Sequence, residues 1–148
     1  ATGGLPQGVL HGDPFLDNVL VDGTTGALAG FVDFEDVCIG PLLFDVACCA
    51  SACCFRQHDN ALEMRRLRSL VEGYASERAL TKPECRAFVA FMKLTMLCNC
   101  SWRFKQFNVD HREIVDCRDA HLELQERVLS LEDDVTVGAI EGMLASLG

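Results

Sequence analysis

The sequence has few basic residues and no long apolar run, and each shortage argues against a class of protein. Its 148 residues include 13 Lys and Arg against 22 Asp and Glu, which gives a net charge of -9. Neutralising a nucleic-acid backbone requires clustered positive charge, so nucleic acid is not an expected partner. The apolar runs are too short and too interrupted to cross a bilayer. Residues 1–8 have neither the basic stretch nor the apolar segment of a signal peptide, and we expect none.

Repeats, linkers and low-complexity stretches are missing as well. Hydrophobic residues make up 49% of the chain and charged residues 24%, which is the balance of a globular protein. This length suits one domain with a modest core. We therefore predict a single domain over residues 1–148, with strands and loops in residues 1–47 and a helical subdomain in residues 48–148.

The cysteines do not have the spacing of a zinc site. Zinc knuckles place C-x2-C or C-x2-H in turns, and Cys98-x-Cys100 does not fit that pattern, so no structural zinc is expected. Cysteines four apart on a helix share a face but bond poorly along the axis. We expect packed free thiols in a reducing intracellular compartment, the cytoplasm or an organelle stroma or matrix. The nine cysteines are at positions 38, 48, 49, 53, 54, 85, 98, 100 and 117.

The periodicity of the chain changes from a strand pattern to a helix pattern near Pro41. Two apolar runs flank the turn at residues 22–26, which contains Asp-Gly, and this arrangement predicts a hairpin. Beyond Pro41 the apolar spacing is helical. One helix start is well marked, because Thr81-x-x-Glu84 with Pro83 forms a capping box. The expected helices cover residues 42–55, 60–78, 81–107, 110–131 and 137–147.

Polar residues that suit phosphoryl transfer follow the first strands. The run HGDPFLDNVL occupies residues 11–20, and GFVDFED occupies residues 30–36. Transfer from ATP needs a carboxylate to orient the acceptor hydroxyl and oxygen ligands for the Mg²⁺ that bridges the phosphates. Asp13 can face the acceptor while Asn18, five residues on, turns its carbonyl to the metal. Asp33 ends the next strand, which the hairpin returns to the same place, and one or two protein ligands suffice for Mg²⁺.

These motifs resemble one kinase family. H-G-D-x4-N-V-L, then V-D-F-E-D, then Gly-Pro at 40–41 and F-D-V-A at 44–47, is similar to the C-terminal lobe of aminoglycoside phosphotransferase-like kinases. That family shares the protein-kinase fold and includes choline, hydroxylysine and type II homoserine kinases. The sequence of residues 15–19 resembles that of the homoserine kinase type. The resemblance implies an α+β fold, mainly α-helical, in which a short β-hairpin carries the catalytic and metal loops.

The resemblance also implies a role for individual residues. Asp13 matches the catalytic base, Asn18 a Mg²⁺ ligand and Asp33 the main Mg²⁺ ligand, with ATP as co-substrate. His11 and Asp45 match positions that brace the catalytic loop. Three further acidic residues are expected near the substrate or the metal: Asp17, Glu35 and Asp36.

The chain departs from the family in what it lacks. A kinase of this fold has an N-terminal lobe with a phosphate-covering loop, a strand Lys and a helix Glu. None of these can be placed in the sequence, so the ATP lobe is expected to be absent and the chain alone inactive. The first hypothesis is therefore the C-terminal lobe of a kinase that phosphorylates a hydroxyl of an amino alcohol or amino acid, such as homoserine. The alternative is a non-catalytic module whose protein partner covers the surface of the missing lobe.

An aromatic group, a histidine and a basic cluster in the helical part can each have either a functional or a purely structural role. Trp102, Phe104 and Phe107 can line an acceptor pocket or pack in the core, and core packing is the favoured use. His121 falls on a helical seam and is expected to be a hydrogen-bonded core residue rather than a ligand. The basic cluster at residues 65–68 is expected to be a solvated helix surface.

Overall fold

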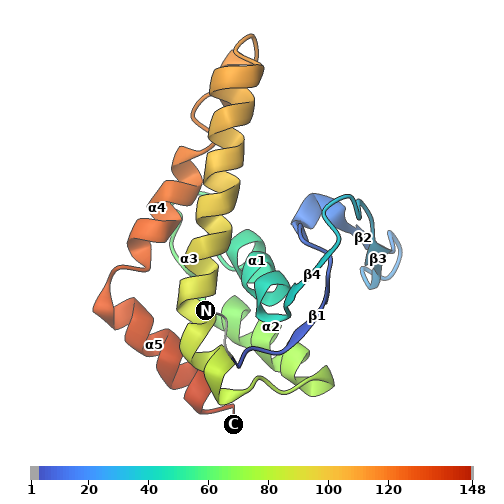
Figure 1. Ribbon diagram of the computed structural model, residues 1–148, viewed down its shortest axis with the longest axis vertical. Coiled ribbons are helices and arrows are strands. Elements are labelled where there is room, and N and C mark those ends of the chain that lie inside the picture. The colour runs from blue at the N-terminus through green and yellow to red at the C-terminus, as the bar shows by residue number, and fades with distance from the viewer. Residues whose placement is uncertain (1–3, 148) are drawn as a thin grey trace.

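The protein is an α+β molecule, mostly helical with small sheets, and its computed structural model describes residues 4–147. Figure 1 shows the helices gathered around the long helix α3, with the strands to one side. Every helix in this described part is too short or too polar to cross a bilayer. The helices are α1 Leu43–Cys53, α2 Met64–Glu77, α3 Lys82–Lys105, α4 Leu122–Ser130 and α5 Asp134–Ala145.

The strands form two separate antiparallel pairs. The expected hairpin is confirmed, since β2 (Val19–Val21) pairs with β3 (Leu28–Phe31) around the turn at residues 22–26. Asp22 builds this turn by accepting hydrogen bonds from the Thr24 and Thr25 backbone N–H groups. The other pair joins β1 (Gln7–Leu10) to β4 (Cys38–Pro41). The β2–β3 hairpin therefore lies between β1 and β4 in the sequence.

The apolar core is built from the helices. Helix α1 packs against both α2 and α3, and α3 packs against α4 and α5. One continuous cluster of buried side chains includes Leu43 of α1, Leu67 of α2, Phe88 of α3, Leu124 of α4 and Ile140 of α5. The strands add little to it, because most of their apolar side chains are exposed. The helices therefore form the platform on which the loops of the first 40 residues rest.

The predicted capping box at the start of α3 is confirmed. The Thr81 hydroxyl accepts a hydrogen bond from the Glu84 backbone N–H, and the Glu84 carboxylate accepts one from the Thr81 backbone N–H at 2.8 Å. Glu84 is completely buried and also forms an ion pair with Arg78. The predicted end of this helix near residue 107 is close to the observed end of α3.

The helix predicted from Asp110 is wrong in its first half. A π turn at Gln106–Asp110 ends α3, and a 3₁₀ turn follows at Val115–Cys117. Asn108 donates a side-chain hydrogen bond to the Arg118 carbonyl at 2.9 Å, which closes this reversal of the chain. The heptad-like spacing continued through residues that turn the chain, and α4 begins only at Leu122.

Two expectations about core packing in this region are also wrong. Trp102 and Phe104 are 58% and 48% exposed, so neither is a core residue. Phe107 is partly buried and meets Trp102 edge to face with ring centroids 6.3 Å apart. His121 is only half-buried; its Nδ1 lies 3.0 Å from the Arg118 carbonyl and its ring packs edge-on against Phe104.

All nine cysteines are free, as predicted, but not all are packed inside. Cys48 and Cys54 are buried, whereas Cys38 and Cys98 are exposed. Burial is the main reason that the pKa of Cys49 is raised to about 12. The pKa values of the Cys48, Cys53 and Cys54 thiols are raised for the same reason. These thiols therefore stay protonated and weakly nucleophilic at neutral pH.

Candidate active site

The loop that follows β1 is folded around Asp13. Backbone hydrogen bonds from Phe15 N to Asp13 O at 2.9 Å and from Asn18 N to Phe15 O at 3.0 Å coil it into a tight turn. Asn18 is buried and donates from Nδ2 to the Asp13 carbonyl at 2.9 Å and to Asp13 Oδ2 at 3.0 Å. The five-residue spacing thus brings the predicted base and the predicted amide ligand into direct contact.

Asp45 joins this loop to the first turn of α1. Its Oδ2 accepts a hydrogen bond from the His11 backbone N–H at 2.7 Å, and its Oδ1 accepts one from the Gly12 N–H at 3.1 Å. On the other side, His11 Nε2 lies 2.9 Å from the Val32 carbonyl oxygen. His11 and Asp45 therefore make the contacts that a bracing role requires, and the role itself stays a prediction.

Gly12 fixes how closely the two acidic loops approach. Its φ is +90°, in the left-handed region that favours glycine. A Cβ atom at this position would lie 2.5 Å from the Asp36 carbonyl oxygen and 2.8 Å from the Asp36 Cβ. Only a residue without a side chain allows the loop of Asp13 to pack on the loop of Glu35 and Asp36.

Asp33 follows Val32, the residue that is hydrogen-bonded to Asn18 at the end of the hairpin. The Val32 backbone N–H donates to the Asn18 carbonyl at 3.0 Å, which places the two predicted metal ligands on adjoining segments. Asp33 has a φ of 64°, an uncommon conformation for a residue with a side chain. Within residues 4–147 its exposed carboxylate makes no hydrogen bond or ion pair. Residues held in uncommon backbone conformations cluster at functional sites.

The electrostatics of the loop favour the protonated form of Asp13. Burial is the largest cause that raises the pKa of this carboxyl above its usual value, and the nearby charges of Asp17 and Asp36 raise it further. The hydrogen bond from Asn18 and the proximity of His11 oppose the rise. Asp13 is therefore a stronger base than an exposed carboxylate.

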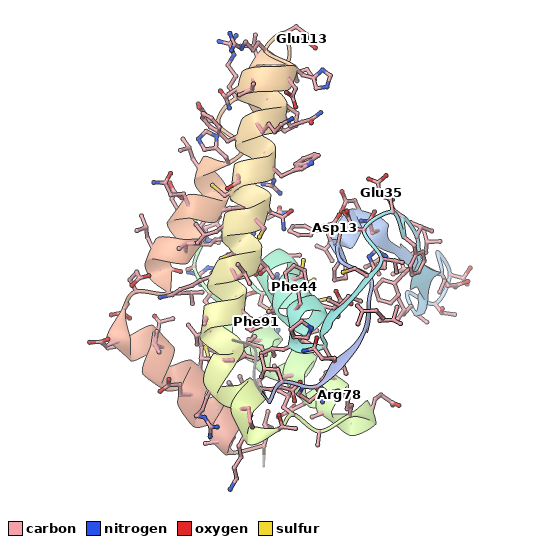
Figure 2. The ribbon with its side chains drawn as sticks, viewed as in Figure 1. Asp13, Glu35, Phe44, Arg78, Phe91 and Glu113 are labelled. Atoms are coloured by element: carbon pink, nitrogen blue, oxygen red, sulfur yellow. The ribbon has the colours of Figure 1, made fainter. Side chains whose placement is uncertain are left out.

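A cavity of about 360 Å³ opens between these loops and helix α3. Figure 2 shows Asp13 and Glu35 on the part of the strand region that faces α3. Asp13, Asp17, Glu35 and Asp36 line one wall. Helix α3 supplies the other wall with four side chains: Cys98, Asn99, Trp102 and Arg103. The volume fits a small-molecule ligand.

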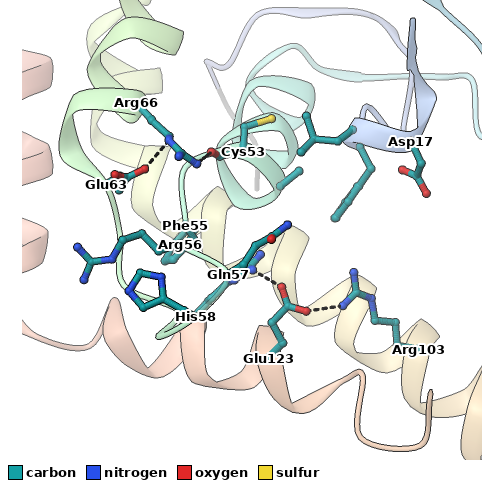
Figure 3. A pocket seen from close by; sticks show the side chains of 14 residues that line it. Asp17, Cys53, Phe55, Arg56, Gln57, His58, Glu63, Arg66, Arg103 and Glu123 are labelled. Atoms are coloured by element: carbon teal, nitrogen blue, oxygen red, sulfur yellow. Dashed lines mark hydrogen bonds and ion pairs between the residues drawn. The ribbon is translucent and has the colours of Figure 1, made fainter. Parts of the chain in front are cut away.

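A larger hollow of about 800 Å³ adjoins this cavity, with Asp17 and Arg103 in both linings. Figure 3 shows Glu123 of α4 next to Arg103. Arg103 Nη1 donates to Glu123 Oε2 at 3.2 Å, and the other oxygen of Glu123 pairs with Arg127. Ion pairs thus line the floor of the hollow.

The sequence predicted little of the α3 wall. Of the two α3 residues for which a pocket role was open, Trp102 lines this cavity and Phe104 does not, and no pocket role was predicted for Asn99 or Arg103. Their signal was available: residues 98, 99, 102 and 103 recur at the three- and four-residue spacing that lies along one face of a helix. What the sequence does not contain is the direction of that face relative to Asp13.

The beginning of the chain matches a known family pattern. The pattern described as "Phosphotransferase enzyme family" matches residues 1–80, which is more than half of the chain. The chain belongs to this family. The matched segment contains every site residue predicted from the sequence, from His11 to Asp45. The resemblance stated from the motifs is therefore confirmed.

Several curated relatives that the chain matches are homoserine kinases. The chain is 42% identical over 83 residues to the homoserine kinase of Gluconacetobacter diazotrophicus, a match that covers 56% of this chain and 25% of the relative. The homoserine kinase of Agrobacterium fabrum is 41% identical over 83 residues, with the same coverage. That of Rhodopseudomonas palustris strain HaA2 is 42% identical over 80 residues, which covers 54% of this chain and 24% of the relative. The chain therefore spans about a quarter of the length of these relatives.

Proposed function

We propose that this chain is the C-terminal lobe of an ATP- and Mg²⁺-dependent kinase that phosphorylates a hydroxyl of a small amino acid or amino alcohol, with homoserine as the first candidate. The observation that carries the proposal is the meeting of two loops. The contact of Gly12 with Asp36 and the hydrogen bond from Val32 N to Asn18 O bring Asp13, Asn18 and Asp33 to one end of the strands. Membership of the phosphotransferase family and the homoserine kinase relatives support it.

Asp13 is the proposed base. Asn18 Nδ2 holds Asp13 Oδ2, and within the described residues Oδ1 accepts no hydrogen bond. That oxygen is free to accept the proton of an acceptor hydroxyl in the cavity of about 360 Å³. The raised pKa of Asp13 brings it closer to the operating pH, which makes a carboxylate a better proton acceptor.

Asn18 and Asp33 suit a Mg²⁺ ion in number and chemistry. The Asn18 amide nitrogen is committed to Asp13, so its carbonyl oxygen is left for a ligand, and the Asp33 carboxylate has no partner among residues 4–147. Mg²⁺ prefers oxygen ligands and takes only one or two protein carboxylates. In these residues no group of three or more His, Cys, Asp and Glu is arranged to hold a metal ion, so phosphate and water oxygens would supply the other ligands. A bound Mg²⁺ would neutralise the charge that develops on the phosphates.

The proposal assigns ATP binding to a second lobe. The sequence contains no phosphate-covering glycine loop with a strand Lys, so these 148 residues are not expected to be active by themselves. The free thiols also suit the reducing compartment proposed for the protein.

The metal assignment is tested by Asp33→Asn in the full-length protein. We expect the turnover of homoserine with ATP and Mg²⁺ to fall by about 10²-fold or more, because a removed transition-state charge contact costs about that much. A coupled assay of ADP release measures it. Asp22→Asn is the matched control, since it makes the same change in the turn of the same hairpin, and Asn also builds such turns.

Full turnover in Asp33→Asn would contradict the assignment of Asp33 as a metal ligand.

A second candidate, a non-catalytic module bound to a protein partner, is favoured by the exposed apolar side chains of the strands, among them Val9, Val21 and Ile39. A loss of turnover limited to Asp33→Asn contradicts that candidate, because a structural module has no need of this carboxylate.

A further inference from the structure

The cavity beside Asp13 has an uneven charge. Four of its lining side chains are acidic, and among the described residues that line it Arg103 carries the only positive charge. An anionic group entering this cavity is repelled by one wall and attracted by a single side chain on the other. A ligand with both a cation and an anion matches both walls.

Arg103 is held in place by only part of its guanidinium, so some of its hydrogen-bond donors are unused within the described residues. Its Nη1 donates to the Ala120 carbonyl at 3.0 Å and to Glu123 Oε2 at 3.2 Å. Within residues 4–147 its Nε and Nη2 atoms make no hydrogen bond. The side chain is 25% exposed, so the guanidinium is fixed on one edge and accessible on another. A guanidinium presented in this way suits bidentate binding of a carboxylate.

The ion-pair group that contains Arg103 has one more positive charge than negative charges. Glu123 is shared, because one of its oxygens pairs with Arg103 and the other with Arg127. Arg127 is buried and fixed by the Ser51 carbonyl at 3.1 Å and the Phe55 ring, so it cannot move away. The group of two guanidiniums and one carboxylate therefore has a net charge of +1. Burial is the largest cause that lowers the pKa of Arg127; Glu123 opposes the fall and Arg103 adds to it, so an added anion would act against the repulsion between the two guanidiniums.

We propose that Arg103 binds the carboxylate of the acceptor, so that the site selects a hydroxy amino acid over the amino alcohol that lacks the carboxylate. In this arrangement the acceptor hydroxyl faces Asp13 and its ammonium group faces the acidic wall. The inference deepens the proposed function and rests on it. Arg103 lies outside residues 1–80, which the family pattern matches.

The test compares two acceptors that differ only by the carboxylate, L-homoserine and 3-aminopropan-1-ol. In the full-length protein with ATP and Mg²⁺, Arg103→Gln should raise the KM for homoserine by about 10- to 100-fold, the usual loss for a charged hydrogen-bonded contact. The KM for 3-aminopropan-1-ol should change by less than about threefold, because no carboxylate contact is lost. Arg103→Lys should have a KM for homoserine between those of the wild type and Arg103→Gln, since lysine keeps the positive charge but cannot bind a carboxylate through two nitrogen atoms.

Two further variants separate recognition from folding. Glu123→Gln breaks the same ion pair but keeps the guanidinium, so the preference for homoserine should persist. Arg86→Gln makes the same substitution as the test variant at an exposed site on α3, outside this cavity, and should leave both acceptors unaffected. An equal loss with both acceptors in Arg103→Gln overturns the inference while leaving the proposed function intact. A wild-type protein that phosphorylates neither acceptor overturns both.

Discussion

At the scale of single residues, the site depends on one position where a side chain cannot fit. Gly12 combines a φ of +90° with a backbone carbonyl, that of Asp36, where its Cβ would be. A carbonyl cannot move aside as the end of a flexible side chain can. The distance between the loop of Asp13 and the loop of Asp36 is therefore set by the absence of a side chain at Gly12.

We expect Gly12→Ala to lower the free energy of unfolding by about 1–3 kcal/mol, since it adds a steric overlap to a strained backbone. Turnover should fall as well, because the loops of Asp13 and Asp33 separate. Thermal unfolding and the kinase assay measure the two effects.

Gly73→Ala is the matched control for this substitution. Gly73 lies within α2 and its added Cβ would meet nothing within 4 Å. Alanine should stabilise that helix by roughly 0.5–1 kcal/mol. If both alanine variants are equally stable, the close contact at Gly12 is not a constraint.

At the scale of elements, the start of α3 is stabilised by a buried carboxylate with several partners. Glu84 accepts hydrogen bonds from the Thr81 N–H and hydroxyl, and it pairs with Arg78, which Tyr74 also contacts at 2.9 Å. The contacts join the end of α2 to the beginning of α3. The connection between the two helices is therefore held by charge as well as by the cap.

Arg78→Met should destabilise the protein by about 3 kcal/mol, because it leaves the charge of Glu84 buried without its partner. Chemical denaturation measures the loss. Arg68→Met is the control, since the Arg68–Glu72 pair in α2 is exposed and should contribute less than about 1 kcal/mol. Similar losses in the two variants would show that burial of Glu84 is not the cause.

At the scale of the whole molecule, the helices and the strands differ in how well they are covered. The buried cluster draws on all five helices, whereas both sheets have only two strands and expose much of their apolar surface. Figure 1 shows the β2–β3 hairpin apart from the helices. Isolated two-stranded sheets are marginally stable in water.

Hydrogen exchange should divide the molecule accordingly. Backbone amides in the buried centre of α3, around Met92, should exchange most slowly, and those of the β2–β3 hairpin should exchange faster by about two orders of magnitude or more. Mass spectrometry of peptides from the two regions measures the difference. Uniform protection would mean that the hairpin is covered in solution, as the interaction-module candidate requires.

Much of this arrangement was predictable from local patterns. The hairpin, the capping box at Thr81 and the helical second part follow from turn chemistry and periodicity, and the motif near Asp13 indicated the family. The chain reversal after Lys105 was not predictable, because the apolar spacing continued through it. The role of Arg103 in lining the cavity depends on how α3 is oriented against the loop, a long-range property that no local pattern contains.

The bonds of Asp45 also have a consequence for the order of folding. Both oxygens of this carboxylate hold the loop before Asp13, and Asp45 itself lies in the first turn of α1, whose inner face is part of the core. The loop therefore lacks this anchor to the helices until α1 is in place. We expect the catalytic geometry to form late in folding, after the helical core, so that an intermediate can have nearly complete helix content and no site for a substrate.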